Sequence, residues 1–471
     1  MLPVSRSAHE GAETANASGI LHRSLKHLPL KVVGASGNYL TLSNGQKILD
    51  ATGGAAVSCL GHGDKRVQDA ITRQMSEVAY CHSLFFSTSA AEDLGQELVA
   101  GTNGAMTKAF IVSSGSEAIE AAMKLARQYH LELSPSQPQR TKFIARKESY
   151  HGTTLGSLSL GGHVSRRALF EPMLLENISR VSACNTYRGK TDGESEQEYV
   201  ARLAKELDDE FHRVGPETVC AFVAEPVVGA ALGCVPSVAG YFEAVKAVCD
   251  KYGALLIMDE IMSGMGRTGT LHAWQQEGVV PDIQTIGKGL GGGYAPVAGV
   301  LINRRVVDVL QKGTGSFSHG QTYQGHPVAC AAAAQVQRII RDDSLCENVK
   351  EMGAYLEKLL KQRLADHPNV GDIRGRGLFW GIEFVKDKAT KEPFDLGSGV
   401  AMGVHEKGLL RHDPSISIYP GTGTADGKSG DHVLLAPAYN VTEADVEKIV
   451  DLTTGVITEF FAELQGKAVL G

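Results

Sequence analysis

The sequence predicts an α/β protein with a large domain built on a mostly parallel sheet flanked by helices, and a smaller α+β domain. The chain of 471 residues is longer than one ordinary domain. Short, continuously apolar runs alternate with helical patterns through its middle, which is typical of a parallel sheet covered on both faces. From about residue 328 the pattern becomes mainly helical, with only a few strand-like runs.

The first repeat unit of the large domain is a strand at 108–114 followed by a helix at 116–130, where apolar and small residues recur at helical spacing. Later apolar runs have the length and the composition of buried strands. We expect these further strands at 141–147, 218–228, 253–261, 282–288 and 297–303.

The smaller domain is expected to contain three helices, at 328–343, 346–367 and 442–464. Strand-like runs at 377–385 and 432–439 lie between the second and the third helix. We expect residues 1–54 to join this domain, residues 55–320 to form the large domain, and residues 321–471 to complete the small one.

Composition excludes several classes of protein. The hydrophobic fraction of 43% and charged fraction of 21% are typical of a globular protein, and the formal charge of −7 argues against nucleic-acid and anionic-membrane partners. No apolar stretch approaches the ~20 residues of a membrane span. The first 19 residues lack an apolar signal core, so we expect a flexible arm there. Eight scattered cysteines without a C-x-x-C pair favour a reduced, cytoplasmic protein without a metal site.

Polar residues follow the predicted strands where they end, which is where open parallel sheets bind ligands. The stretch 114–116, Ser-Gly-Ser, comes after the first strand and opens a helix. Free N–H groups and the positive end of the helix suit a phosphate there, and glycine lets the backbone approach it closely. Taken alone, Ser114 would be interpreted as an ordinary N-cap.

Two acidic strand ends and one lysine complete this layer. Glu225 follows one run, Asp259 and Glu260 follow the next, and Lys288 stands among five glycines in "TIGKGLGGG". Pyridoxal phosphate requires such a set: a lysine for its aldehyde, a carboxylate for its ring nitrogen and a helix start for its phosphate. Tyr150 offers an aromatic face for the ring. The glycines would then let the chain pass closely beneath a flat ring.

Six stretches in the right order resemble the motifs of class III aminotransferases, also called ω-aminotransferases, which have pyridoxal-phosphate fold type I. These stretches are "VSSGSEAIEAAMKLAR", "SYHG", "AEPVVGA", "IMDEIMSGMGRTG", "TIGKGLGGGYAPVAGVL" and "HGQTYQGHPVACAAA". The resemblance runs from about residue 30 to the C-terminus. It implies an aminotransferase that uses pyridoxal 5′-phosphate.

The resemblance also implies site residues. Lys288 would be the Schiff-base lysine and Asp259 the partner of the ring nitrogen, and these two are the catalytic residues. Thr322 would reach the phosphate from the other subunit, so the active unit would be a homodimer with shared active sites. The cofactor-binding set implied in this chain is Ser114, Gly115, Ser116, Tyr150, His151, Glu225, Asp259, Ile261, Lys288 and Thr322.

The residue that meets a substrate carboxylate is left open by the sequence. Many relatives carry an arginine in the region 408–440. Alignment from "GLL" puts Arg411 in its place, whereas alignment from "GDHVLLAP" puts Gly427 or Lys428 there, because about fifteen extra residues intervene. Arg374 and Arg376 are alternatives. We therefore expect an enzyme without a strict α-carboxylate clamp, which accepts amines that lack this group.

The substrate pocket is expected to be roomy and apolar. The loop "GGAAVSCLGHG" carries Ala55, Ala56 and Val57 where relatives often place an aromatic residue. Phe85 and Phe86 would form an apolar wall, with core packing as the alternative for both. The expected substrate contacts are therefore Phe85, Phe86, Ala56, Tyr150 and Arg411.

The expected reaction is a ping-pong transfer of an amino group from a small-molecule amine donor to pyruvate or another 2-oxo acid acceptor, in which Lys288 moves the proton. A 4-aminobutyrate- or ornithine-type aminotransferase is one alternative. A decarboxylase or aminomutase on the same fold is another, and a non-catalytic cofactor-binding protein is a third.

Overall fold

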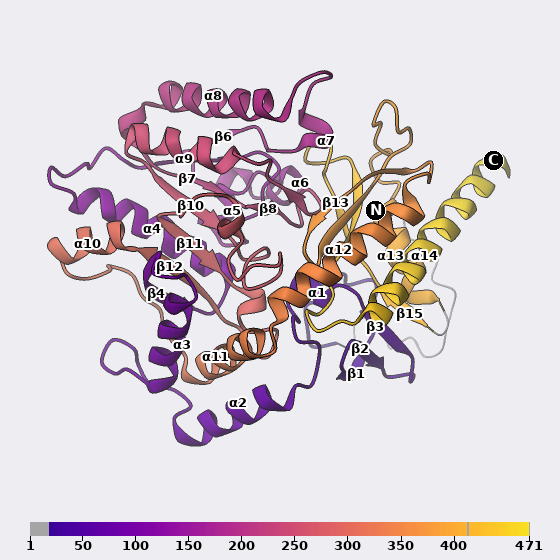
Figure 1. Ribbon diagram of the computed structural model, residues 1–471, viewed down its shortest axis with the longest axis horizontal. Coiled ribbons are helices and arrows are strands. Elements are labelled where there is room, and N and C mark those ends of the chain that lie inside the picture. Colours follow the sequence, from indigo (N-terminus) through magenta and orange to yellow (C-terminus); the bar gives the residue numbers. More distant parts are fainter. Residues whose placement is uncertain (1–17, 412–413, 471) are drawn as a thin grey trace.

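The computed structural model describes residues 18–411 and 414–470, with side chains up to residue 466. Residues 1–17, which make up most of the expected N-terminal arm, lie outside this description. Figure 1 shows a large body that carries a wide central sheet, and a smaller body that contains both the first strands and the last helix of the described chain.

The central sheet has seven strands, and all but one run in the same direction. Strand β12 is antiparallel to both of its neighbours, β11 and β4, while the remaining neighbours pair in parallel. This confirms the predicted fold class. The strand order is β4 (Met106–Val112), β12 (Ala298–Asn303), β11 (Ile283–Ile286), β10 (Leu255–Asp259), β7 (Val219–Ala224), β5 (Lys142–Arg146) and β6 (Ile178–Val181).

Helices cover both faces of this sheet, as the continuous apolar runs predict. In β10, Leu255 and Ile257 pack in the apolar cluster of α4 (Gly115–Glu132), on one face. Leu256 and Met258 pack on the other face, in the cluster of α8 (Glu196–Val214) and α9 (Tyr241–Tyr252). Every residue of β10 is buried because its two alternating sets of side chains both meet helices.

The other helices of the large body are shorter or lie at its edges. Figure 1 shows α2 and α3 beside α11, below the sheet. Their bounds are α1 (Gly53–Ala56), α2 (Lys65–Glu77), α3 (Ser89–Ala100), α5 (Leu155–Leu160), α6 (Val164–Arg167), α7 (Thr186–Gly189), α10 (Arg304–Lys312) and α11 (Pro327–Asp342), with a short hairpin of β8 (Val227–Val228) and β9 (Val235–Pro236).

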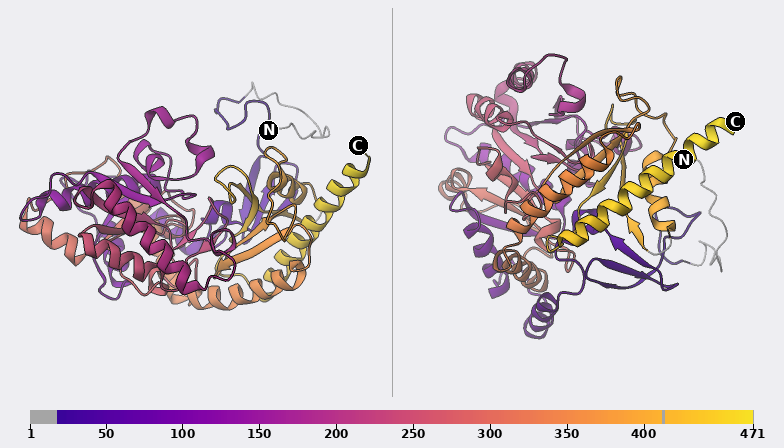
Figure 2. Two further views of the ribbon diagram at one scale, coloured as in Figure 1. Left: turned by 90° about the horizontal axis from the view of Figure 1, so that it is seen from above. Right: turned by 45° about the vertical axis from the view of Figure 1, so that its right-hand side comes forward.

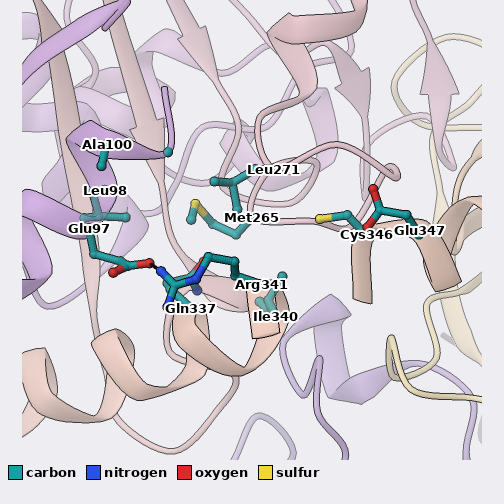
Figure 3. A pocket seen from close by; sticks show the side chains of 11 residues that line it. Glu97, Leu98, Ala100, Met265, Leu271, Gln337, Ile340, Arg341, Cys346 and Glu347 are labelled. Atoms are coloured by element: carbon teal, nitrogen blue, oxygen red, sulfur yellow. Dashed lines mark hydrogen bonds and ion pairs between the residues drawn. The ribbon is translucent and has the colours of Figure 1, made fainter. Parts of the chain in front are cut away.

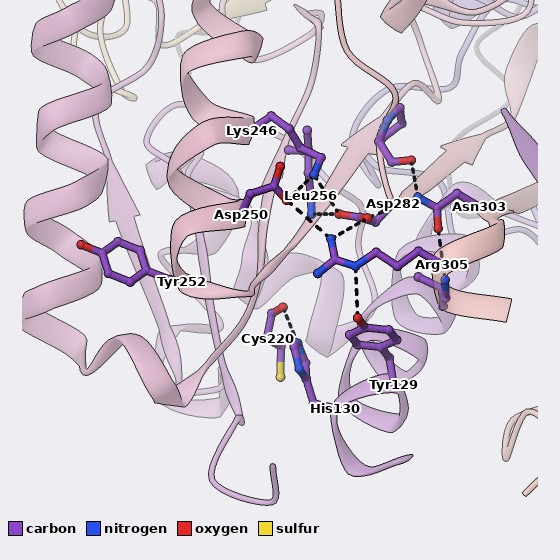
Figure 4. A network of polar contacts seen from close by, with 12 residues as sticks. Tyr129, His130, Cys220, Lys246, Asp250, Tyr252, Leu256, Asp282, Asn303 and Arg305 are labelled. Carbon is purple, nitrogen blue, oxygen red and sulfur yellow. Dashed lines mark hydrogen bonds and ion pairs between the residues drawn. The ribbon is translucent and has the colours of Figure 1, made fainter. Parts of the chain in front are cut away.

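A polar network ties together the edge of the sheet at which β10 and β11 begin (Figure 4). The Asp282 carboxylate accepts hydrogen bonds from the Leu256 N–H at 2.9 Å and from the Asn303 side-chain amide at 3.2 Å. Arg305 lies 3.3 Å from the same carboxylate and 3.5 Å from Asp250 of α9. These contacts join β10, β11, β12, α9 and α10 at the end of the sheet opposite the predicted site.

The smaller body combines the two ends of the chain. Strand β15 (Ser415–Ser417) pairs in parallel with β3 (Lys47–Asp50), which continues the N-terminal ribbon of β1 (Val32–Ser36) and β2 (Tyr39–Leu42). A second sheet has the order β13 (Val370–Arg376), β14 (Phe379–Phe384), β17 (Asp431–Leu435), β16 (Tyr419–Thr422). The pairing of β3 with β15 supports an N-terminal segment that joins the small domain, while the boundaries at 54 and 320 stay predictions.

Long helices support these two sheets: α12 (Leu345–Leu364), α13 (Val400–Leu410) and α14 (Glu443–Leu470). Figure 2 shows α12 and α14 side by side along one surface of the molecule. None of the described helices, including the 28-residue α14, is long and apolar enough to cross a membrane. All eight cysteines are free.

Candidate active site

The predicted site residues gather at one edge of the large sheet. Because only β12 is reversed, the carboxyl ends of β4, β5, β7, β10 and β11 face the same way. Ser114 and Lys288 each follow a strand by two residues, Glu225 follows β7 directly, and Asp259 is the last residue of β10. The topology therefore brings together residues that are more than 170 positions apart in the sequence.

Lys288 is half-buried and has a left-handed backbone conformation, with a φ of 46°. Burial lowers the pKa of its amine from 10.5 to about 8, the negative charges of Asp259 and Glu225 oppose this shift, and the positive charge of Arg166 adds to it. An amine with this pKa is neutral in a substantial fraction of molecules near neutral pH. Lys288 is thus prepared to act as a nucleophile and as a proton carrier.

Asp259 is held rigidly by three hydrogen bonds. One oxygen lies 2.7 Å from Nδ1 of His151, and the other accepts from the Ile261 N–H and from the Thr285 hydroxyl, each at 3.1 Å. The side chains of Asp259 and His151 are 4% and 0% exposed. The Nε2 atom of His151 has no hydrogen-bond partner among the described residues. A buried, oriented carboxylate of this kind can stabilise a protonated ring nitrogen.

Glu225 provides a second buried carboxylate next to the first. Its two oxygens accept from the N–H groups of Tyr150, at 3.1 Å, and of Gly229, at 3.3 Å. Burial raises the pKa of this carboxyl, the charge of His151 lowers it, and the charge of Asp259 raises it. The charge of Asp259 therefore affects the pKa of Glu225, as expected for two carboxylates at the same edge of the sheet.

The segment 114–116 begins α4 in the way that the sequence predicts. The Ser114 hydroxyl caps the helix by accepting from the Glu117 N–H at 3.3 Å, and the Ser116 hydroxyl accepts from the Thr153 N–H at 3.0 Å. A Cβ atom on Gly115 would lie 3.0 Å from Ile261. The free N–H groups of this first turn and the positive helix end suit an anionic group.

Tyr150 and Ile261 are the residues predicted to contact the two faces of a flat ring, and this contact stays a prediction. Tyr150 is half-buried, and the guanidinium of Arg166 lies 4.6 Å from the centroid of its ring. Ile261 contacts Gly115 and Gly287, where a Cβ atom would lie 3.0 and 3.1 Å away. The two glycines therefore let Ile261 lie close to the backbone that follows β4 and to the backbone that follows β11.

The glycines after Lys288 have a different physical reason from the one that the sequence suggests. A Cβ atom on Gly289 would lie 2.9 Å from the Tyr439 hydroxyl, and one on Gly291 would lie 2.5 Å from Val297. Gly292 and Gly293 have positive φ angles of 57° and 84°. Close protein contacts and turn geometry account for these four glycines without a ring beneath them.

Thr322, Phe85 and Phe86 lie at the surface of the single chain. Phe85 and Phe86 are 72% and 65% exposed, which rules out packing in the core of the same chain. Tyr80 joins their loop to Thr322, because its hydroxyl donates to the Thr322 carbonyl at 3.0 Å, and its ring lies 5.9 Å from that of Tyr323. We call Tyr80, Phe85, Phe86 and Tyr323 the aromatic patch.

Arg411 lies against α14 in this structure, and its contact with a substrate carboxylate stays a prediction. Its guanidinium forms an ion pair with Glu459 of α14 at 2.9 Å and lies against Gly455 of the same helix. Arg374 and Arg376 are also occupied, since they pair with Glu383 and Glu277, each at 2.6 Å.

Ala56 is 3% exposed and belongs to an apolar cluster with Met262 and Phe379, beside a small pocket that Ala55 and Ala56 both line. The contact of Ala56 with a substrate stays a prediction. The neighbouring Ala55 is partly exposed, so it could also border a substrate.

The loop 423–430, which contains the extra residues of the sequence, lies against α6. The Gly427 carbonyl accepts from the hydroxyl of Ser165 at 3.2 Å, and a Cβ atom on Gly427 would lie 2.7 Å from Val164. Lys428, the other alignment candidate, is exposed. The sequence did not identify Arg166, which is next to Ser165, or Thr285, whose hydroxyl donates to Asp259. The partners of an arginine or a threonine cannot be read from the sequence alone.

A cavity of about 370 Å³ opens elsewhere, between α3, α11 and the loop after β10 (Figure 3). Leu98, Met265, Leu271 and Ile340 contribute to its wall, and none of the ten predicted cofactor-binding residues lines it. The Glu97–Arg341 ion pair closes one side. The convergent polar groups lie elsewhere, at the sheet edge.

Fold and site together define a pyridoxal-phosphate enzyme of fold type I, and comparison with known proteins gives the same answer. The chain matches the family described as "Aminotransferase class-III" over residues 20–455. It is 60% identical to an "Aminotransferase" of Gibberella zeae over 431 residues, covering 91% of this chain and 84% of that protein. It is 35% identical to "Gamma aminobutyrate transaminase 3, chloroplastic" of Solanum lycopersicum, covering 90% and 79%.

A solved structure shows the same fold. The ω-transaminase from Pseudomonas jessenii in complex with PMP superimposes with a TM-score of 0.83 and 32% identity, covering 92% of this chain and 93% of that one. The chain described here belongs to the class III aminotransferases. Its cofactor is pyridoxal 5′-phosphate.

Proposed function

We propose that this aminotransferase moves an amino group from an amine or an ω-amino compound to pyruvate or another 2-oxo acid, with Lys288 as its catalytic lysine. One observation carries the proposal. The Lys288 amine, whose pKa burial lowers to about 8, shares a sheet edge with the Asp259–His151 pair and with the first turn of α4. These are the three partners that the aldehyde, the ring nitrogen and the phosphate of the cofactor need.

The residues present fit the cofactor. Lys288 would hold its aldehyde carbon, Asp259 its ring nitrogen, and the first turn of α4 its phosphate. Tyr150 and Ile261 would contact the two faces of the ring. Glu225 would lie towards the phenolic oxygen, and burial raises the pKa of its carboxyl.

When bound, pyridoxal phosphate withdraws electrons from the substrate carbon that carries the nitrogen. The donor amine would take the place of Lys288 at the aldehyde carbon, which frees the Lys288 amine. The free amine would then take a proton from the donor carbon and give it back on the cofactor side, as base and then as acid. Asp259 stabilises the positive ring nitrogen throughout, and its hydrogen bonds from His151 and Thr285 keep it from turning away. The acceptor repeats these steps in reverse, which makes the cycle ping-pong.

The donor class is proposed from two similarities and one feature of the chain. The Pseudomonas jessenii protein is called an ω-transaminase, and the Solanum lycopersicum protein is called a γ-aminobutyrate transaminase. In this chain Arg411 is paired with Glu459, so it is not available as an α-carboxylate clamp. This favours donors whose amino group is not adjacent to a carboxylate, with Ala55 and the phenyl rings of Phe85 and Phe86 near the donor.

The active unit is proposed to be a homodimer that is formed through the aromatic patch. Burying exposed aromatic rings provides a strong driving force for association. Thr322 lies beside the patch, because the Tyr80 hydroxyl donates to its carbonyl. A second copy docked there could supply Thr322 to the phosphate and Phe85 and Phe86 to the donor pocket.

The test of this function is a half-reaction assay on purified holoenzyme. An amine donor such as 1-phenylethylamine or 4-aminobutyrate should bleach the cofactor absorbance near ~410 nm, and pyruvate should restore it. Lys288→Ala should lose this cycle. Release of carbon dioxide, or bleaching that no 2-oxo acid reverses, would contradict transamination and would favour a decarboxylase.

A further inference from the structure

Arg166 is the charged residue beside the site that the cofactor chemistry leaves without a role. It is half-buried on α6, and its guanidinium lies 4.6 Å from the ring centroid of Tyr150. No carboxylate pairs with it in residues 18–411 and 414–466. A partly buried guanidinium that lacks a carboxylate can form strong, two-pronged hydrogen bonds with one that arrives on a ligand.

Arg127 and Arg180 are half-buried and also lack a carboxylate, but their guanidinium groups donate to backbone carbonyls, that of Arg140 for Arg127 and those of Ser159 and Gly161 for Arg180.

Other arginines have carboxylate partners. Arg188 and Arg374 share Glu383, and Arg376 pairs with Glu277, all at 2.6 Å. The chain has 53 acidic and 46 basic residues, so acidic partners are abundant. The lack of one at Arg166 is therefore a local property of this position and does not reflect a shortage of carboxylates.

The position of Arg166 is fixed from its own helix. The next residue, Arg167, is buried and donates to the carbonyls of Leu158, Ser159 and Gly161 at 2.9, 2.7 and 2.8 Å. These bonds anchor α6 to the end of α5. Arg166 therefore extends from a held backbone, unlike an arginine on a free surface loop.

The inserted loop 423–430 holds α6 from a second side. The N–H and hydroxyl of Ser165 both donate to the Gly427 carbonyl, at 3.4 and 3.2 Å. Gly427 has a φ of 79° and leaves no room for a Cβ atom next to Val164. The loop 423–430, which contains residues that many relatives lack, thus supports α6.

The charge of Arg166 reaches the reacting centre. It lowers the pKa of the Lys288 amine, after burial, and it lowers the pKa of the Tyr150 hydroxyl against the larger effect of burial. Arg23 acts on Tyr150 in the same direction. Two arginine charges therefore act on Tyr150, against the opposing charge of Asp259.

We propose that Arg166 binds the carboxylate of the substrate, in place of the occupied Arg411, and so determines which acids this enzyme accepts. The inference rests on the proposed function. A donor or acceptor held near Lys288 would direct its carboxylate past Tyr150 to the Arg166 guanidinium. A donor without a carboxylate would make no use of Arg166.

The first test is binding without turnover. Butanoate, which is 4-aminobutyrate without its amino group, would be titrated into the holoenzyme in a calorimeter, with uncharged butanamide as the matched control. We expect Arg166→Gln to weaken butanoate binding by about tenfold to a hundredfold and Arg166→Lys to weaken it less. Butanamide binding should be equal in all three proteins. Equal butanoate binding by native enzyme and Arg166→Gln, or none by either, would overturn the proposal.

The second test separates a carboxylate contact from a structural role. Half-reactions would be followed with 4-aminobutyrate, with pyruvate and with 1-phenylethylamine. A KM of Arg166→Gln that rises more for either acid than for 1-phenylethylamine supports the proposal, and the acid affected tells whether the carboxylate is remote or adjacent to the reacting carbon. An equal loss with all three compounds would contradict it.

Two further variants keep the result interpretable. If Arg166→Gln does not retain cofactor, Arg166→Lys decides, because it keeps the charge but not the two-pronged geometry. A loss of acid binding in Arg411→Gln while Arg166→Gln is normal would place the contact at Arg411 and overturn the inference. Failure of the proposed function would look different, since native enzyme would then not transfer amino groups from any of the donors.

Discussion

At the scale of single residues, the site depends on how burial changes ordinary side chains. Lys288 follows β11 by two residues. Burial disfavours the positive charge of its amine, while the negative charges of Asp259 and Glu225 favour it. The balance is a pKa of about 8 instead of 10.5. The same burial raises the pKa of Glu225. A lysine whose pKa is lowered and a carboxyl whose pKa is raised are both typical of sites that transfer protons.

This balance predicts the pH dependence of cofactor capture. Below about pH 8 the Lys288 amine is mostly protonated and cannot attack an aldehyde, so the rate at which apoenzyme captures pyridoxal phosphate should rise with pH and level off above that value. Stopped-flow absorbance would measure the rate. A rate that is constant from about pH 6 to 9, or that rises only near the ordinary lysine value of 10.5, would contradict the prediction.

A second prediction concerns the carboxylate of Asp259. Asp259→Asn keeps the size of the side chain but removes the charge that a positive ring nitrogen requires, so the first half-reaction should slow about 10²–10³-fold. Thr285→Val is the matched variant, because it removes one 3.1 Å hydrogen bond to the same carboxylate and should cost only about 1 kcal/mol. Single-turnover absorbance would compare the two. Equal rates in Asp259→Asn and native enzyme would exclude this role.

At the scale of elements, the strands that carry the site could be predicted, while the orientation of one of them could not. Apolar runs identify β4, β5, β7, β10, β11 and β12, because buried strands in a covered sheet must be apolar throughout. That β12 runs against its neighbours depends on the short connection from β11, which the pattern of residues does not reveal. The short β6, with three of its four residues only partly buried, lacks the apolar signal and was missed.

The site residues divide in the same way. Those that end a strand or begin a helix, such as Ser114, Asp259 and Lys288, have positions that follow from local pattern and topology. The role of Arg411 could not be predicted, because its partner Glu459 lies 48 residues away on α14. The burial of Ala56 could not be predicted, because a loop sequence does not show which methyl group turns inward. Arg166 was missed for the opposite reason, since its lack of a carboxylate partner is visible only in the fold.

Packing between elements predicts opposite effects for two glycines inside helices. A Cβ atom on Gly353 of α12 would clash with the carbonyl of Gly377, at the turn between β13 and β14, so Gly353→Ala should destabilise the protein by about 1–3 kcal/mol. Gly95 of α3 has open space around it, so Gly95→Ala should stabilise by about 0.5–1 kcal/mol. Thermal unfolding would measure both. A melting temperature that moves the same way in both variants would disprove the packing argument.

At the scale of the whole molecule, the polar network that holds the sheet and the residues of the candidate site lie at opposite edges of the sheet. The network around Asp282 holds the sheet at the edge where β10 and β11 begin, and the carboxyl ends of these strands carry Asp259 and Lys288. The small body combines the N-terminal strands with the last third of the chain, so β3 and β15 meet although they are more than 360 residues apart. The aromatic patch is one exposed apolar feature of the single chain, in addition to other exposed apolar side chains such as Leu21 and Leu169.

The patch predicts how assembly and activity depend on each other. Replacing both Phe85 and Phe86 by Glu places charges where the proposed dimer buries rings, so the variant should be monomeric and should bind cofactor more weakly. Leu396→Glu, which alters a side chain that is 68% exposed outside the patch, should remain dimeric. Light scattering after gel filtration would give the masses. A dimeric double variant with normal cofactor binding would rule out this interface.

The central claim is that Lys288 is the residue to which pyridoxal phosphate binds covalently, and trapping that bond tests it most directly. Holoenzyme would be reduced with borohydride, digested, and mapped by mass spectrometry. The account predicts the cofactor label on the peptide that contains Lys288 and no label on Lys288→Ala. A label on any other lysine, or an unlabelled Lys288 in enzyme that transfers amino groups, would contradict it.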